Sequence, residues 1–181
     1  MKNNQKVDII ASLLCIFLGS LLLIFPLMKY SNINTSFMTA MFGYSIIHSS
    51  KFILTKDTSN FESILKSLAS LLVGSLAFMI KVGDSSLNLA ILLFIWVRLE
   101  SLIKLKKADY YNDRNNKLWI LEISFLAIFI LMGILTAINL NYNSDIQILM
   151  LGYFFFTNGI LEFIDPIIIT LTKESTNENR K

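Results

Sequence analysis

Seven polar side chains interrupt long apolar stretches of this sequence, and they are the residues best placed to do chemistry. They are His48, Lys51, Arg98, Glu100, Asn158, Glu162 and Asp165. Ionisable groups inside segments of this kind are costly, so they usually face a protein interior, a water-filled cavity or a partner. The mixture of carboxylates and basic groups suits intramembrane ion pairs, or a hydrated vestibule that serves a transporter or channel.

Two interpretations of these residues remain open. In the first, they form one cluster in which Arg98 pairs with Glu162 and Glu100 faces Lys51 or His48. In the second, they act separately: Lys51 and Lys104 extend to the membrane interface, Arg98 and Glu162 form a structural pair, and a backbone carbonyl satisfies His48. Both interpretations predict an ion pair between Arg98 and Glu162.

Arg98 places the strictest demand on its surroundings, because a guanidinium keeps its charge under essentially all conditions. Arg98 and Glu100 are two residues apart and point about 200° from each other on a helix, so each needs a partner on another helix. Glu122, a few residues into its own apolar stretch, is expected to reach inner-side water or a lysine.

Signatures of an enzyme are weak. The chain has one histidine and one cysteine, which excludes His-rich metal sites. Cys15 lies nearer the middle of its apolar stretch than His48 does, so a Cys–His pair is not expected. There is no glycine-rich phosphate loop and no HExxH motif. The sequence therefore predicts a protein without catalytic residues, a bound metal or a cofactor.

The composition favours a membrane protein. Of 181 residues, 54% are hydrophobic and only 16% are charged, and the mean hydropathy is +0.60. Apolar stretches of about 20 residues, the length that crosses a bilayer core, recur along the chain. They cover approximately residues 7–28, 33–54, 62–80, 87–105, 118–140 and 146–171. These stretches predict an all-α fold with six transmembrane helices in a single domain, residues 1–181.

The distribution of lysine and arginine predicts the orientation. With a cytoplasmic N-terminus, thirteen of these residues lie on the inner side, and only Lys29 and Lys81 lie on the outer side. This bias satisfies the positive-inside rule with both termini in the cytoplasm, and a bacterial cytoplasmic membrane is the expected location. The first stretch resembles a signal peptide but is long and lacks a cleavage site, so we interpret it as an uncleaved helix. The basic residues flank the spans, which gives no reason to expect nucleic-acid binding.

Small residues recur at a fixed spacing in the first and third stretches. Ser12, Cys15 and Gly19 match Ser67, Ser70 and Gly74 at a shift of 55 residues, and Gly43-Tyr44 matches Gly152-Tyr153 at a shift of 109. Small residues allow helix backbones to approach closely in lipid. The positions expected at helix contacts are Cys15, Gly19, Ser70, Gly74, Gly152 and Gly159. The pattern predicts three tandem parallel hairpins, approximately 7–54, 62–105 and 118–171, against the alternative of chance similarity among apolar segments.

Three tandem hairpins with these small residues resemble the HdeD-like membrane proteins. The resemblance extends from Val7 to Leu171 and is carried by Gly19 and Pro26, by Gly74, and by Gly133 with Asn158-Gly159-Ile160. It implies six spans and an association with acid or envelope stress, and we expect a non-enzymatic protein. The expected partners are the bilayer and a second copy or another membrane protein. The alternative is a small transporter or channel that uses the polar cluster.

Overall fold

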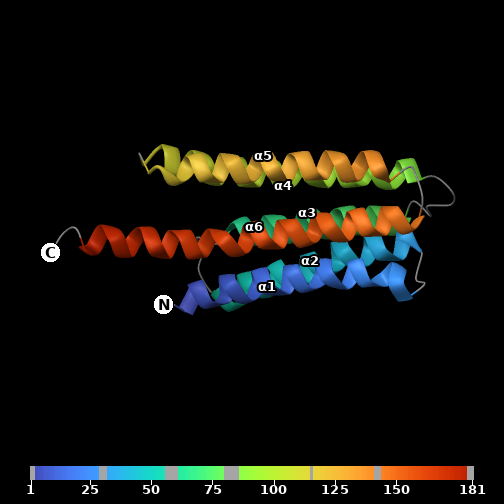
Figure 1. Cartoon of the computed structure of the whole chain (residues 1–181), viewed down its shortest axis with the longest axis horizontal. Coiled ribbons are helices and arrows are strands. Elements are labelled where there is room, and N and C mark those ends of the chain that lie inside the picture. The colour runs from blue at the N-terminus through green and yellow to red at the C-terminus, as the bar shows by residue number, and fades with distance from the viewer. Residues whose placement is uncertain are drawn as a thin grey trace.

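The computed structural model describes residues 3–28, 32–55, 61–79, 86–114, 116–140 and 144–178, and over these residues the chain is all-α, without strands. The helices in these ranges are α1 (Asn3–Ile24), η1, a short 3-10 helix (Phe25–Met28), α2 (Ile33–Thr55), α3 (Phe61–Met79), α4 (Ser86–Asn112), α5 (Leu118–Asn139) and α6 (Ser144–Glu178). Figure 1 shows them as one elongated bundle with both chain ends at the same end. The all-α fold predicted from the sequence is confirmed.

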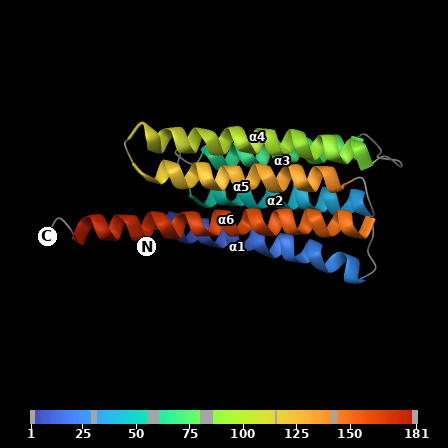
Figure 2. The same cartoon turned by 45° about the horizontal axis from the view of Figure 1, so that its top comes forward.

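The described α-helices form a closed ring. Each helix packs against the next in sequence, and α6 returns to pack against α1 (Figures 1 and 2). The most extensive contacts join α1 with α6, α2 with α3, and α4 with α5. Short connections make sequential helices antiparallel neighbours, which accounts for the alternating direction of the ring.

Four of the described helical segments are long and apolar enough to cross a membrane. They are Asn4–Met28, Phe61–Met79, Leu118–Asn139 and Ile146–Ile168, which is consistent with a membrane protein. The segments α2 and α4 have 23 and 27 residues but are more polar. Their mean hydropathy is lowered by His48 and Lys51 in α2 and by Arg98 and Glu100 in α4.

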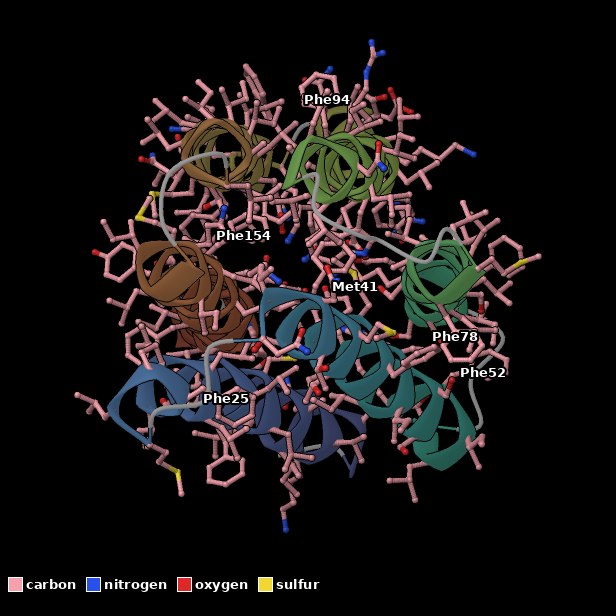
Figure 3. The ribbon with its side chains drawn as sticks, turned by 90° about the vertical axis from the view of Figure 1, so that its right-hand side faces the viewer. Phe25, Met41, Phe52, Phe78, Phe94 and Phe154 are labelled. Atoms are coloured by element: carbon pink, nitrogen blue, oxygen red, sulfur yellow. The ribbon has the colours of Figure 1, made fainter. Side chains whose placement is uncertain are left out.

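Side chains divide between an apolar outer surface and a mainly aromatic core. Met41 and Phe154 point into the bundle, whereas Phe78 and Phe94 point away from it (Figure 3). At the centre, the fully buried Trp96 stacks on Phe155 with ring centroids 5.3 Å apart. The Trp96 indole also donates a hydrogen bond to Ser70 Oγ at 2.8 Å. Ser70 therefore lies at a helix contact, between α3 and α4.

The contact between α1 and α6 is a close approach of backbones. A Cβ added to Gly19 would lie 2.3 Å from the backbone nitrogen of Phe156. A Cβ on Gly159 would lie 2.6 Å from the backbone nitrogen of Ile16, and one on Gly152 would lie 2.9 Å from that of Leu23. Only residues without a side chain allow this separation.

Two other glycines contact the helix that precedes their own. A Cβ on Gly74 in α3 would lie 3.2 Å from Cβ of Met41 in α2. A Cβ on Gly133 in α5 would lie 2.6 Å from a methyl group of Val97 in α4. Glycines therefore lie in the α2–α3 and α4–α5 contacts as well as in the contact between α1 and α6.

Helices α4 and α6 continue beyond the expected spans. They end at Asn112 and Glu178, because the polar residues after each apolar stretch contain no glycine or proline and continue the helix. Pro166 lies inside α6 and lacks the N–H that would bond to the carbonyl of Glu162. The hydroxyl of Ser12 in α1 lies 2.9 Å from that carbonyl oxygen and 2.9 Å from the carbonyl oxygen of Asp8 in its own helix, so the two acceptors share one donor.

Candidate functional site

A buried polar cluster lies between α1, α2, α3, α4 and α6, and Glu162 is at its centre. Glu162 Oε1 accepts hydrogen bonds from Tyr44 Oη at 2.8 Å and from Lys66 Nζ at 2.9 Å. Lys104 Nζ lies 3.8 Å from the same oxygen. One carboxylate thus holds groups from three other helices. Neither of its two lysine partners, Lys66 and Lys104, was predicted to lie there, and Lys104 was expected to extend to the membrane interface.

The second oxygen of Glu162 faces His48. His48 Nε2 lies 3.5 Å from Glu162 Oε2, which is too long for a good hydrogen bond. Neither ring nitrogen has a hydrogen-bond partner, although the imidazole is only 1% exposed. A backbone carbonyl does not satisfy this histidine, so that expectation was wrong.

Cys15 lies beside the same two residues. The thiol sulfur, an imidazole nitrogen and a carboxylate oxygen of Cys15, His48 and Glu162 are all within 4.8 Å of one another. The expectation that Cys15 and His48 lie apart was wrong. The reason is visible in Figures 1 and 2: α1 begins at Asn3, and its first turns extend past the end of α2, which brings the two residues level.

Glu100 lies on a buried stripe of α4. Trp96, Glu100 and Lys104 are spaced by four residues and are all buried. Both carboxylate oxygens of Glu100 are buried without a hydrogen-bond partner. The amide of Asn158 donates to Tyr44 Oη at 3.4 Å, and its own side-chain oxygen has no partner. The expected pairing of Glu100 with Lys51 or His48 is not formed.

Three further ion pairs lie toward the end of the bundle where the chain termini are. Lys107 Nζ lies 2.8 Å from Glu122 Oε1 and also pairs with Asp165. Lys51 Nζ lies 3.0 Å from Asp8 Oδ1. The expectation that Glu122 reaches a lysine is confirmed, whereas Asp165 and Lys51 pair outside the cluster around Glu162.

The predicted pair between Arg98 and Glu162 is wrong. Arg98 is exposed on the outer face of α4, where its guanidinium carbon lies 5.8 Å from the centroid of the Phe94 ring. The geometry of α4 explains the error: Glu100 faces the interior, so Arg98, about 200° away, must face outward. On an apolar outer surface this charge requires water, a lipid phosphate or an acid of another chain.

Lys66 is the principal residue that sequence reasoning missed. It is one of the thirteen basic residues expected on the inner side, yet it is 5% exposed and bridges Glu162 with Glu62, whose Oε1 is 3.0 Å away. A signal was present in the sequence. Lys66, Ser70 and Gly74 are spaced by four residues, so the stripe expected to contact other helices includes this lysine.

An apolar groove between α3 and α4 opens on the outside of the bundle. Its volume is about 530 Å³, and its lining includes the exposed leucines Leu68, Leu72 and Leu102. None of its lining residues belongs to the cluster around Glu162.

Comparisons with protein-family models, with curated proteins and with solved structures find no match for this chain.

Proposed function

We propose that the chain crosses the membrane six times as three parallel hairpins, α1–α2, α3–α4 and α5–α6, with both termini in the cytoplasm. Three features support this arrangement. The chain ends lie at one end of the bundle (Figure 1). The buried ion pairs lie toward that end. Gly19, Gly74 and Gly133 each contact the second helix of the preceding hairpin around the ring. Lys29 and Lys81, the two outer-side basic residues, lie outside the described residues.

We propose further that the protein is a small transporter or channel whose buried polar interior binds a cation. One observation carries this proposal: carboxylates outnumber ammonium groups among the buried and half-buried residues that face this interior. Among the described residues, the six carboxylates and four ammonium groups are Asp8, Glu62, Glu100, Glu122, Glu162 and Asp165, and Lys51, Lys66, Lys104 and Lys107. An excess of negative charge in a low-dielectric interior attracts a cation.

A purely structural role for these charges does not explain why Glu100 is buried. A buried ion pair contributes little stability compared with an apolar replacement, and a carboxylate without a hydrogen-bond partner is more costly still. Glu100 is fully buried and has no such partner. A group of this kind inside a membrane segment is by default part of a site that binds something.

The aromatic core favours a gated site over an open pore. On α4, Trp96 precedes Glu100 by one turn, and on α2, Tyr44 precedes His48 by one turn. Each aromatic residue therefore lies on the outer side of its polar neighbour in the proposed orientation. The rings of Tyr44 and Trp96 pack edge to face at 5.3 Å. They close the bundle axis outside the charges, so a cation would enter from the cytoplasm until the helices rearrange.

The test is charge movement in proteoliposomes on a solid-supported membrane after jumps in Na⁺, K⁺, Mg²⁺ or Zn²⁺. We expect the wild-type protein to give a transient with at least one cation, and Glu100→Gln to reduce it at least about tenfold. Asp109→Asn is the matched control, because Asp109 is exposed on the same helix. Absence of any transient, or equal transients in Glu100→Gln and wild type at equal melting temperature, contradicts the proposal.

A second candidate is a non-enzymatic, HdeD-like protein that supports acid or envelope stress tolerance. The equivalent positions of Gly19, Gly74 and Gly133 favour it, because they fit the expected short repeat. In this case the wild-type protein would give no charge-movement transient, and changes to the polar cluster would lower stability alone. The same measurements, made together with melting curves, separate the two functions.

A further inference from the structure

We propose that Cys15, His48 and Glu162 bind a divalent transition-metal ion, with zinc as the best fit. The three residues come from α1, α2 and α6, and their donor atoms lie within 4.8 Å of one another. This proposal goes beyond cation transport, because it holds whether the metal is moved or stays bound.

The donor set determines the class of metal. A thiolate, an imidazole and a carboxylate are the ligand types that zinc takes in proteins, whereas calcium and magnesium prefer oxygen ligands alone. In tetrahedral zinc sites, neighbouring N, O and S donors are about 3.3–3.6 Å apart, from metal–ligand distances of about 2.0–2.3 Å. His48 Nε2 and Glu162 Oε2 are already 3.5 Å apart. Small movements of Cys15 would complete the triangle.

The imidazole of His48, which faces Glu162 but makes no hydrogen bond, is a further indication of a ligand. His48 is 1% exposed, and neither of its nitrogens makes a hydrogen bond. Buried polar groups are almost always satisfied, so an orphaned histidine inside a protein needs an explanation. A metal bound to one nitrogen supplies it. Cys15 is likewise fully buried at the same place, as a small apolar residue would be, and the metal gives its sulfur a role.

The surroundings hold Glu162 in an orientation that leaves one oxygen free. Tyr44 and Lys66 bind Oε1 at 2.8 and 2.9 Å, which points Oε2 toward His48. Groups of this outer layer commonly fix the ligands of metal sites.

The charges near the site accommodate a divalent ion. The thiolate of Cys15 and the carboxylate of Glu162 together neutralise its two charges. Lys66 Nζ and Lys104 Nζ, at 2.9 and 3.8 Å from Glu162 Oε1, oppose a further cation. Glu62, 3.0 Å from Lys66 Nζ, offsets the first of them. Glu100, one turn from Lys104 on α4, supplies a second negative charge.

The test uses Co²⁺ as a spectroscopic probe, with the full-length protein in detergent. Cys15 is the single cysteine of the chain, so a thiolate-to-cobalt charge-transfer band reports only on this site. We expect a band that saturates at one Co²⁺ per chain and is displaced by Zn²⁺. Cys15→Ser should abolish the band. His48→Gln should weaken Co²⁺ binding by at least about 100-fold, since loss of outer-layer groups alone costs about 10–100-fold.

Arg98→Gln is the control and should bind as the wild type does, because Arg98 points to the outside of the bundle. The imidazole of His48 holds no other helix through a hydrogen bond, and Cys15→Ser changes one atom, so melting curves should show both variants folded. A folded wild type without the charge-transfer band overturns the proposal. So does a His48→Gln variant that binds Co²⁺ as tightly as the wild type. Charge movement is measured separately, so failure here leaves the transport test intact.

Discussion

Replacing Gly19 with alanine tests the close approach of α1 and α6. The added Cβ would lie 2.3 Å from the backbone nitrogen of Phe156, 2.5 Å from its Cα and 2.9 Å from the carbonyl carbon of Phe155. All three are backbone atoms, so no rotamer change can remove the clash. Ordinary contact begins at 3.4 Å. The two helices must therefore separate by about 1 Å at this point.

Two opposing terms set the magnitude of the change. Alanine favours a helix over glycine by about 1 kcal/mol. Overpacking costs about 1–3 kcal/mol, and more where neighbours cannot yield. Because the obstructing atoms belong to the backbone of α6, we take the upper part of that range and add the weaker packing of the separated helices. We expect Gly19→Ala to lower the free energy of unfolding by about 2 kcal/mol.

Gly74→Ala is the matched control, because its Cβ would meet side-chain atoms only. These are Cβ of Met41 at 3.2 Å and the ring edge of Phe42 at 3.3 Å. A shift of a few tenths of an ångström relieves both contacts, and the gain in helix propensity offsets the cost, so the change should be within about 0.5 kcal/mol of zero. Equilibrium unfolding in mixed micelles, followed by tryptophan fluorescence, measures both variants. If Gly19→Ala is as stable as Gly74→Ala, the packing of α1 against α6 described above is incorrect.

Three further changes test the charges and the orientation. Lys66→Met should cost about 3 kcal/mol by leaving Glu162 underpaired, and adding Glu162→Leu should restore much of it; additive losses in unfolding would exclude the pair. Arg98→Leu should alter stability by no more than about 0.5 kcal/mol, as exposed positions do, and a loss as large as that of Lys66→Met would return Arg98 to the interior. On a cysteine-free background, Asn32→Cys should react with an impermeant maleimide in intact cells and Arg114→Cys only after permeabilisation. The reverse pattern would invert the orientation.

The helices themselves follow from local sequence. The stretch expected from about Ile33 to Leu54 is α2, Ile33–Thr55, and the stretch expected from Leu118 is α5, which begins at that residue. Long apolar runs bounded by polar breaks determine such elements without tertiary information. The small residues Gly19 and Gly74 were likewise expected at helix contacts, and a Cβ on either would meet a neighbouring helix within 3.2 Å.

The partners of the charged groups could not be obtained in the same way. Arg98 and Glu162 lie on apolar stretches at similar expected depth, but depth does not say which face of a helix points inward. Only the spacing of Trp96, Glu100 and Lys104, all buried, fixes that face of α4. The choice of Lys66 as partner depends also on which helices are neighbours, and single sequences carry no direct signal for that arrangement.

Glu162 unites the packing and the chemistry of this bundle. Pro166 removes the helical hydrogen bond to the Glu162 carbonyl, and Ser12 of α1 replaces it at 2.9 Å. The hydroxyl of a serine is short, so it reaches that oxygen only because α1 and α6 approach closely at Gly159 and Gly19. The same approach brings Cys15 beside the Glu162 side chain. The glycines that let α1 and α6 touch thus also place the thiol of Cys15 beside the carboxylate of Glu162, next to the imidazole that α2 supplies.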